Sequence, residues 1–158
     1  MAHPPEFHKI NVDGALADDG RLLSIGVIIR NSKGGAIAAL SKTLPGQYTS
    51  LETEIIALEN GVLLAKELEL SQVVFESDSL TAIQSLQALD FEGDLGHLCQ
   101  GIINLMDSFR SWKFKQLKRD YNKVAYELAQ YARRNAISQV WKGVSPPMVQ
   151  HLIHLECN

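Results

Sequence analysis

The stretch HKINVDGAL, residues 8–16, decides how the chain is interpreted, because a short apolar run ends there on a single carboxylate, Asp13. Residues 7–12 are typical of a short β-strand. Asp-Gly is an ordinary turn signal, so Asp13 followed by Gly14 fits a turn at the end of that strand. Gly14 would also let the backbone approach a ligand closely. Two interpretations of Asp13 stand side by side: a turn residue, or one member of a metal site.

Two further strands follow this stretch. The runs LLSIGVIIRN at 22–31 and AIAALSKTL at 36–44 are apolar and bounded by turn signals. Between them, SKGG at 32–35 is typical of a hairpin turn, and Pro45-Gly46 ends the third strand. Together with residues 7–12, these runs predict a meander of three antiparallel strands.

The rest of the chain alternates between helices and strands. Thr49 and Glu52 have the spacing of a capping box, and the apolar residues after them repeat at helical spacing as far as Ala65. Helices that separate strands imply parallel crossovers. The predicted class is therefore α/β (α+β), a five-stranded mixed sheet flanked by helices. The later elements are expected as a strand at 72–77, helices at 79–88 and 95–109 around a loop at 90–94, a strand at 112–118, a helix at 121–136 and a helical tail from Pro146-Pro147.

The chain length of 158 residues fits one domain with a hydrophobic core. Residues 1–141 are expected to form that domain, and residues 142–158 a tail that Trp141 packs onto it. Trp112 and Phe114 alternate on one face of the strand at 112–118 and are expected in the core.

Composition excludes several classes of protein. No apolar stretch is long enough to span a bilayer, and the first residues lack the pattern of a secretory signal. Two cysteines, Cys99 and Cys157, form neither a disulfide framework nor a metal spacing, which favours reduced thiols in an intracellular protein. The compartment stays open between nucleus and cytosol.

Charge is distributed unevenly along the chain. The net charge is −3, but residues 110–134 hold eight basic and two acidic side chains, so that segment is +6 and the remainder is −9. Such asymmetry is typical of a face that contacts phosphates, and also of an ordinary solvated surface.

Glu54 is a second candidate ligand. On a helical wheel it falls on the apolar side of the helix after Thr49, with Leu51, Leu58 and Gly61. Burying a carboxylate there is costly unless it is paired or bound to a cation. The alternative is an acid in the first helical turn, favoured by the helix dipole.

Asp78 is the third candidate, at the end of the buried run VVFESD. Its alternative role is to cap the helix that starts at residue 79. If the strand ending at Asp78 pairs beside the first strand, Asp13, Glu54 and Asp78 can meet. Hard oxygen ligands without Cys or His favour Mg²⁺ or Mn²⁺, and two such ions could activate water at a phosphodiester.

Four motifs resemble those of the ribonuclease H-like family: NVDGA at 11–15, TEIIALENGVLLAKEL at 53–68, VVFESDS at 73–79 and NKVAYELAQYA at 122–132. The resemblance runs nearly from end to end and is strongest to plant ribonuclease H-like domains related to non-LTR retroelement reverse transcriptases. It implies a two-metal endonuclease that cuts the RNA strand of an RNA–DNA hybrid.

The resemblance also implies roles for individual residues. Asp13 would bridge two Mg²⁺ or Mn²⁺ ions, and Glu54 and Asp78 would complete the ligand set. Backbone amides near Gly14 and at the Thr49–Ser50 turn would contact the hybrid, where 2′-hydroxyls distinguish RNA from DNA. The basic run would contact phosphates. The nucleic-acid-binding residues expected on this basis are Gly14, Thr49, Ser50, Lys115, Lys118, Arg119, Asn122 and Lys123.

The fourth motif departs from the family pattern. That pattern has an Asn, three further residues, an Asp and then x-Leu-Ala, whereas this chain has Tyr126 at the position of the Asp. Tyrosine is not anionic at neutral pH, since its pKa is near 10. The nearest acids, Asp120 and Glu127, are poor substitutes because Glu127 points about 100° away on a helix. The loop histidine of bacterial members has no match.

Three functions stay open at this stage. The first is an active Mg²⁺-dependent ribonuclease H that uses Asp13, Glu54 and Asp78. The second is a catalytically impaired domain that still binds nucleic acid, as Tyr126 suggests. The third is a domain used for protein contacts, in which the acids serve only as caps and turns.

Overall fold

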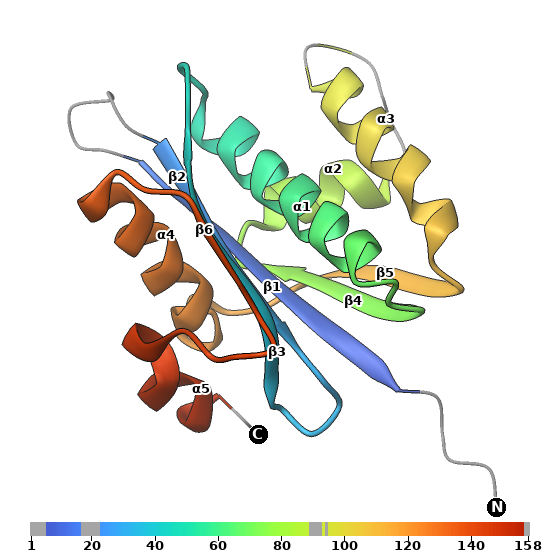
Figure 1. The fold of residues 1–158 in the computed structure, drawn as a ribbon. Coiled ribbons are helices and arrows are strands. Elements are labelled where there is room, and N and C mark those ends of the chain that lie inside the picture. Colours follow the sequence, from blue (N-terminus) through green and yellow to red (C-terminus); the bar gives the residue numbers. More distant parts are fainter. Residues whose placement is uncertain (1–5, 17–22, 89–92, 94, 157–158) are drawn as a thin grey trace, which may run out of the picture.

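The computed structural model describes residues 6–16, 23–88, 93 and 95–156, and is built on one mixed sheet (Figure 1). The order across the sheet is β5-β4-β1-β2-β3-β6. None of the helices described is both long and apolar enough to cross a membrane. The strands are β1 Phe7–Ala15, β2 Leu23–Arg30, β3 Ala36–Leu44, β4 Gln72–Ser77, β5 Ser111–Gln116 and β6 Gln139–Lys142. The helices are α1 Ser50–Glu67, α2 Leu80–Gln87, α3 Gly96–Leu105, α4 Lys123–Asn135 and α5 Gln150–Leu155, with short 3₁₀ turns η1 Met106–Ser108, η2 Arg119–Tyr121 and η3 Pro147–Val149.

Strand pairing confirms the predicted topology. β1, β2 and β3 pair antiparallel, and the β2–β3 turn has Gly34 at φ 86°. β4 pairs parallel with β1 and with β5, so the predicted crossovers are confirmed. Because β1 and β4 are parallel neighbours, their carboxyl ends lie at the same edge of the sheet.

The predicted count of five strands is wrong, since β6 adds a sixth that pairs antiparallel with β3. β6 has only four residues, and only Trp141 in it is buried, so it lacks the run of apolar residues that marks a strand in a sequence. Trp141 packs in the core with Val149 and Ile153 of the C-terminal segment.

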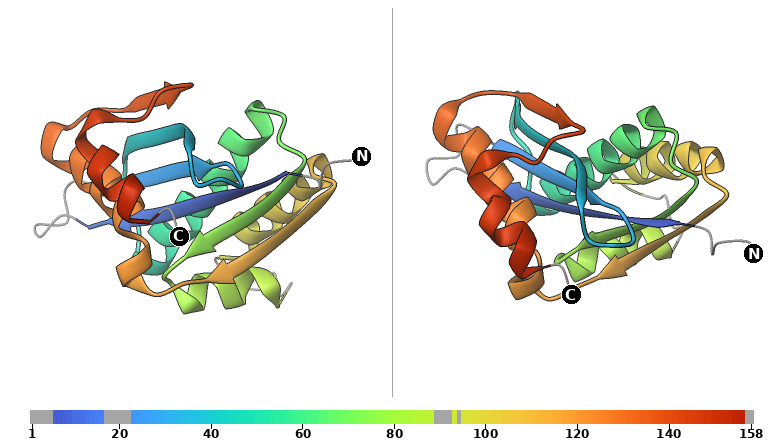
Figure 2. Two further views of the ribbon diagram at one scale, coloured as in Figure 1. Left: turned by 90° about the horizontal axis from the view of Figure 1, so that it is seen from below. Right: turned by 60° about the horizontal axis from the view of Figure 1, so that its bottom comes forward.

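Helices cover both faces of the sheet (Figures 1 and 2). On one face, the larger core joins α1, α2 and α3 to the side chains of Ile10, Val12 and their neighbours. On the other face, α4 and α5 pack over Ile28 and Ala39. Side chains alternate along β1, so Asn11 and Asp13 point away from the larger core.

Other element boundaries differ from the predictions. β1 continues to Ala15, three residues past its predicted end. The helix predicted at 95–109 ends at Leu105 and continues as η1, and the helix predicted at 121–136 begins at Lys123 after η2. Trp112 was expected in the core but is 40% exposed, because β5 is an edge strand; Phe114 is buried as expected. The loop predicted at 90–94 lies largely outside the described residues, as does Cys157.

Helix α4 lies unusually close to the sheet. A Cβ atom at Gly26 of β2 would be 2.2 Å from the Ala125 carbonyl oxygen and 2.5 Å from the Ala129 amide nitrogen. Buried serines strengthen the contact: the hydroxyl of Ser24 donates to the Ala129 carbonyl at 2.6 Å, and that of Ser41 to the Leu128 carbonyl at 2.7 Å. Small residues on β2 and β3 therefore set the position of α4.

We expect Gly26→Ala to destabilise the fold by about 3 kcal/mol, because the added methyl meets helix backbone, which cannot move aside as a flexible side chain can. Urea unfolding followed by circular dichroism measures this change. Gly101→Ala in α3 is the matched control, because no described atom outside the backbone of its own helix lies within 4 Å of the added Cβ. Removing a helical glycine there should stabilise the fold by roughly 0.5–1 kcal/mol. Equal unfolding midpoints for the two variants would contradict the close approach of α4.

Candidate active site

Three carboxyl groups from distant parts of the sequence meet at the shared edge of β1 and β4. Asp13 comes from β1, Glu54 from the first turns of α1, and Asp78 from the residue after β4. One carboxylate oxygen from each lies within 4.8 Å of the others. Within the described residues, this is the one group of three or more His, Cys, Asp or Glu side chains close enough to share an ion.

Asp13 is not a turn residue. It lies inside β1, where it is paired with Gly26 of β2, and it is buried. Gly14 is still part of the strand, and a Cβ atom there would be 2.7 Å from the Thr53 side chain. Gly14 therefore allows the start of α1 to approach β1, and this brings Glu54 beside Asp13.

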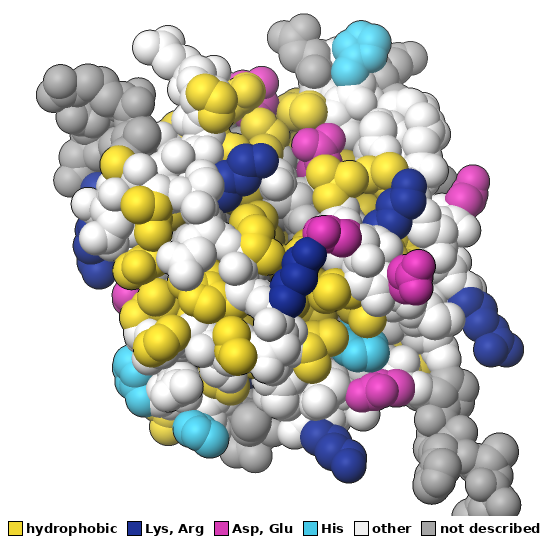
Figure 3. Space-filling view, viewed as in Figure 1, with side chains coloured by type: hydrophobic (Ala, Val, Ile, Leu, Met, Phe, Trp, Pro, Cys, Tyr) yellow, Lys and Arg dark blue, Asp and Glu magenta, His cyan; other side chains and the backbone are white. Residues whose placement is uncertain are grey.

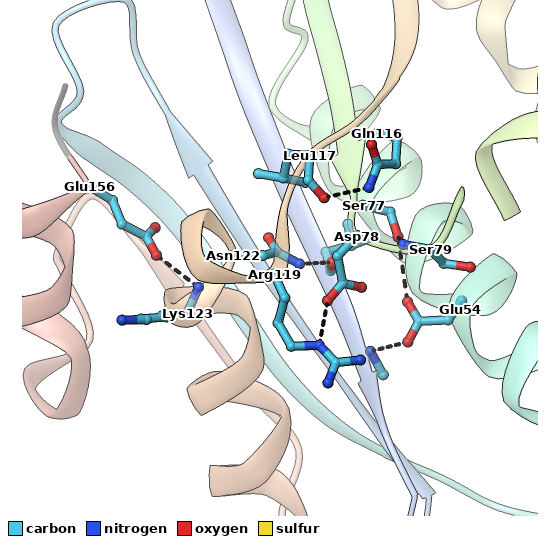
Figure 4. Close-up of polar contacts among 12 residues, drawn as sticks. Glu54, Ser77, Asp78, Ser79, Gln116, Leu117, Arg119, Asn122, Lys123 and Glu156 are labelled. Carbon is cyan, nitrogen blue, oxygen red and sulfur yellow. Dashed lines mark hydrogen bonds and ion pairs between the residues drawn. The ribbon is translucent and has the colours of Figure 1, made fainter. Parts of the chain in front are cut away.

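Glu54 is held by contacts across the site. Its Oε1 accepts a hydrogen bond from the Gly14 amide at 3.1 Å, and its Oε2 lies 3.5 Å from the Ser77 hydroxyl, which can donate to it (Figure 4). The predicted capping box is confirmed, with Thr49 and Glu52 bonded reciprocally. Because Glu52 serves the helix terminus, Glu54 is not needed there and faces the acidic cluster.

Asp78 does not cap α2. That role belongs to Ser79, whose hydroxyl accepts from the Ala82 amide at 3.2 Å. The ion-pair partner of Asp78 is Arg119, with Nε 3.5 Å from Oδ2 (Figure 4). The Arg119 side chain is almost wholly exposed, so this pair is screened by solvent and contributes little to stability.

The negative charges of the three carboxyl groups are poorly compensated by positive charge. Burial, and then the negative charge of Asp78, raise the pKa of Asp13 from 3.8 to about 7. Burial, and then the charges of Asp13 and Asp78, raise the pKa of Glu54 from 4.5 to about 9. A hydrogen bond between the two side chains lowers the first pKa and raises the second, as expected when Glu54 holds the proton. A bound cation would remove this repulsion.

Without metal, we expect the protein to lose stability as the pH rises from about 4 to about 9. A carboxyl with a raised folded-state pKa stabilises the fold fully below its unfolded pKa, and this contribution is lost as the pH rises through the folded pKa. That loss is complete near pH 7 for Asp13 and near pH 9 for Glu54. Melting temperatures in EDTA across this pH range measure the effect.

Glu54→Gln is the matched variant, because glutamine still accepts from the Gly14 amide but cannot ionise. Its melting temperature should fall less than that of the wild type between about pH 6 and 9. Parallel curves for the two proteins would show that Glu54 does not titrate in this range.

The acids line a pocket of about 240 Å³ that is suited to a hard cation. All three candidate ligands supply oxygen, which Mg²⁺ and Mn²⁺ prefer. Asp13, Glu54 and Asp78 are the residues that could hold such ions. The pocket is further lined by Gly14, Ser50, Thr53, Arg119, Tyr126 and Gln130, among others.

Tyr126 lies in the pocket with the three acids, at the place where the fourth motif would supply a carboxylate. Its side chain is 43% exposed. Neither Asp120 nor Glu127 lines the pocket, and Glu127 is instead 3.9 Å from Arg134. Gln130, one helical turn beyond Tyr126, is a buried member of the pocket that the sequence did not reveal, because a lone glutamine in a helix carries no motif.

The predicted nucleic-acid contacts are not all brought together. Gly14, Ser50 and Arg119 line the acidic pocket, and Thr49 is exposed beside it as the N-cap of α1. Lys118 and Lys123 are exposed on either side of η2, whereas Lys115 lines a different pocket. On the face in Figure 3, most Lys and Arg side chains are scattered among hydrophobic, uncharged and acidic ones.

Asn122 has a different role from the one predicted. It is buried, its amide donates to the Val12 carbonyl at 2.8 Å, and it faces Asn11 at 3.4 Å (Figure 4). It is therefore not presented to a nucleic acid. Its hydrogen bond to Val12 connects the start of α4 to β1 next to Asp13, so it positions Tyr126 relative to the three acids.

Comparisons with known proteins agree on the fold. Ribonuclease H1 from the halophilic archaeon Halobacterium salinarum NRC-1 is 21% identical, with 82% of this chain and 98% of that chain covered and a TM-score of 0.76. LC11-RNase H1, solved in complex with an RNA/DNA hybrid, is 22% identical, with 82% and 98% covered and a TM-score of 0.73. The N-terminal ribonuclease H domain of a Mycobacterium tuberculosis protein is 20% identical, with 82% and 95% covered and a TM-score of 0.74.

At these identities the likeness establishes the ribonuclease H fold, not the activity. Among curated proteins, none matches the chain by sequence. The model of the reverse transcriptase-like family matches residues 11–132. The chain belongs to this family, whose members are ribonuclease H-like.

Proposed function

We propose that this protein is an endonuclease that cleaves the RNA strand of RNA–DNA hybrids and requires Mg²⁺ or Mn²⁺, with two ions at the acidic cluster. The observation that carries the proposal is the meeting of Asp13, Glu54 and Asp78 within 4.8 Å in a pocket open to solvent. The family and the fold of the solved neighbours, one of them bound to an RNA/DNA hybrid, support it.

Residues of the acidic pocket would have separate roles in binding the metal ions and the substrate. Asp13, Glu54 and Asp78 would hold the ions, and Asp13 is the most buried of the three. Metal ions at such a site activate water and stabilise the leaving oxygen of a phosphodiester. The Gly14 amide and the Ser77 hydroxyl orient Glu54. Arg119 also lines the pocket, and on substrate binding its ion pair with Asp78 would be replaced by one with a phosphate of the substrate.

Tyr126 favours a second candidate, a catalytically impaired domain that binds nucleic acid or another protein. With tyrosine in place of a carboxylate, the pocket has one fewer negative charge with which to hold metal. We therefore infer that any cleavage is weak and needs high metal concentrations. We also propose a relationship to plant domains related to non-LTR retroelement reverse transcriptases, on the motifs of the sequence, and a location in the nucleus or cytosol, on its composition.

One assay separates these candidates. The purified protein is incubated with an end-labelled RNA–DNA hybrid and with double-stranded RNA and DNA of the same sequence, in Mg²⁺, Mn²⁺ or EDTA. Cleavage of the RNA strand of the hybrid only, lost in EDTA and in Asp13→Asn, would support the nuclease. Salt-sensitive binding without cleavage would support the impaired domain. If the protein neither cuts nor binds, a protein-contact role remains.

A further inference from the structure

A second and larger pocket, of about 480 Å³, lies on the sheet face that carries α4. It runs across β5, β4, β1 and β2, beyond the part of the sheet against which α4 packs. Its volume falls in the range of about 300–1,000 Å³ that is usual for sites that bind small molecules. We call it the sheet-face pocket; its lining includes Phe7, Lys9, Asn11, Arg30, Glu76, Lys115, Tyr121 and Glu156.

Two buried charged side chains in this pocket have unused hydrogen-bonding capacity. Glu76 is 5% exposed, and its side chain makes no hydrogen bond or ion pair within the described part of the chain. It lies in β4 between Asn11 of β1 and Lys115 of β5. Arg30 is also 5% exposed, and its Nε has no hydrogen-bond partner among the residues that the structure describes. Buried polar groups are normally satisfied, so the Arg30 Nε points to a ligand that is bound there, and the Glu76 carboxylate is free to accept from it.

Glu156 does not neutralise the lysines of this pocket. Its carboxylate accepts from the Lys123 amide at 2.8 Å (Figure 4). It also accepts from the Arg30 guanidinium and from the Val124 amide at 3.3 Å. It thus closes the N-terminus of α4 and engages one end of Arg30. Lys9 and Lys115 line the same pocket and form no ion pair within the described residues, so they are available to a phosphate.

Aromatic rings and the position of η2 indicate the class of ligand. Tyr121 is 65% exposed and Phe7 is also exposed, and both line the pocket. Exposed aromatic rings beside lysines are the usual means of binding unpaired nucleotides, by stacking and by contact with phosphate. The three residues of η2 link the two pockets, since Arg119 lines the acidic pocket and Tyr121 the sheet-face pocket.

We propose that the sheet-face pocket binds one unpaired nucleotide of a strand whose neighbouring part lies at the acidic cluster. Lys9 and Lys115 bind its phosphate, Tyr121 stacks on its base, and Glu76 accepts hydrogen bonds from the base. Guanine is the preferred base, because its adjacent N1–H and N2–H groups match a carboxylate that accepts with both oxygens. The strand connection rests on the proposed function, whereas the pocket itself does not.

Fluorescence anisotropy in EDTA tests the proposal. Three probes are compared: a blunt RNA–DNA hybrid, the same hybrid with a short unpaired RNA end of guanosines, and one with an end of uridines. We expect the guanosine end to tighten binding roughly tenfold over the blunt hybrid, as one stacked base commonly does. Tyr121→Ala should remove most of that gain and leave the blunt hybrid unaffected. Lys66→Ala, in the exposed last turn of α1, is the control and should keep the gain.

Glu76→Gln tests the choice of base. The variant should bind the guanosine and uridine ends about equally, provided that its melting temperature shows it to be folded. Free guanosine monophosphate and a single-stranded oligoguanylate are tested in parallel. Their binding, lost in Tyr121→Ala, would support the pocket even if the protein neither binds nor cuts the hybrid.

Two results would overturn the proposal. One is an unpaired end that adds no affinity in the wild type, together with free guanylate that does not bind. The other is an equal loss for blunt and extended hybrids in Tyr121→Ala, which would place Tyr121 against the duplex instead of in a nucleotide pocket.

Discussion

Asp13→Asn is expected to abolish metal-dependent cleavage and, at the same time, to stabilise the metal-free protein. Asp13 is the most buried of the three carboxylates, and its loss removes one of the three candidate ligands of the cluster. Metal stabilisation of transition-state charge is worth several kcal/mol, which corresponds to at least about a thousandfold in rate. Single-turnover cleavage of the hybrid measures this loss.

The gain in stability follows from the electrostatics of the cluster. Burial and the charge of Asp78 raise the pKa of Asp13 to about 7, so above that pH the ionised side chain destabilises the fold. One pKa unit is worth about 1.4 kcal/mol, and the buried amide has a desolvation cost of its own, so we expect a gain on the order of 2 kcal/mol at pH 8 in EDTA. Urea unfolding measures it.

The two opposite changes distinguish a lost ligand from a damaged fold. A variant that loses both activity and stability would indicate collapse of the site, and one that keeps its activity would show that the cluster is not catalytic. Asp107→Asn is the matched control, since Asp107 is an exposed acid in η1 outside the acidic pocket. It should change neither quantity.

Tyr126→Asp is expected to raise the cleavage rate and to lower the metal concentration needed for half-maximal activity. Tyr126 lines the pocket with Asp13, Glu54 and Asp78, so an aspartate there adds an anionic oxygen to the same pocket. Removing groups that merely support metal ligands changes affinity by about 10–100-fold, so we expect a gain of tenfold or more from a direct ligand. Magnesium and manganese titrations of hybrid cleavage measure it.

Tyr126→Asn separates the effect of adding a negative charge from the effect of removing the tyrosine ring. It removes the ring as aspartate does but carries no charge, so it should leave the metal requirement nearly unchanged. An equal gain in both variants would mean that the tyrosine acts by obstruction. If Tyr126→Asp changes neither rate nor metal requirement, the missing carboxylate does not limit this site.

Local patterns in the sequence predicted most of the fold and the acidic cluster. The capping box at Thr49 and Glu52 forms because its partners are three residues apart, and nothing distant is needed. Glu54 was identified because its apolar neighbours share its side of the helix. Both signals depend only on residues that are close together in the sequence, so they can be recognised without the tertiary structure.

The misassigned residues depend on neighbours that are distant in sequence. Trp112 and Phe114 alternate on the same strand, yet only Phe114 is buried, because the edge position of β5 leaves Trp112 uncovered. Strand β6 exists only because β3 offers an unpaired edge. The sequence predicted Asn122 as a substrate contact, but its side-chain amide donates a hydrogen bond to the Val12 carbonyl.

For this protein, the sequence by itself determined the class of fold, the three acids and the tyrosine that interrupts the fourth motif, because each is a matter of residue type and spacing. Only the tertiary structure decided that Asp13, Glu54 and Asp78 are free of the turn and cap roles open to them, and that Lys115 lies at a separate pocket. The reason is that burial and pairing depend on how β1, β4 and α1 come together. That arrangement is set by the packing of the whole core and not by any one stretch of the chain.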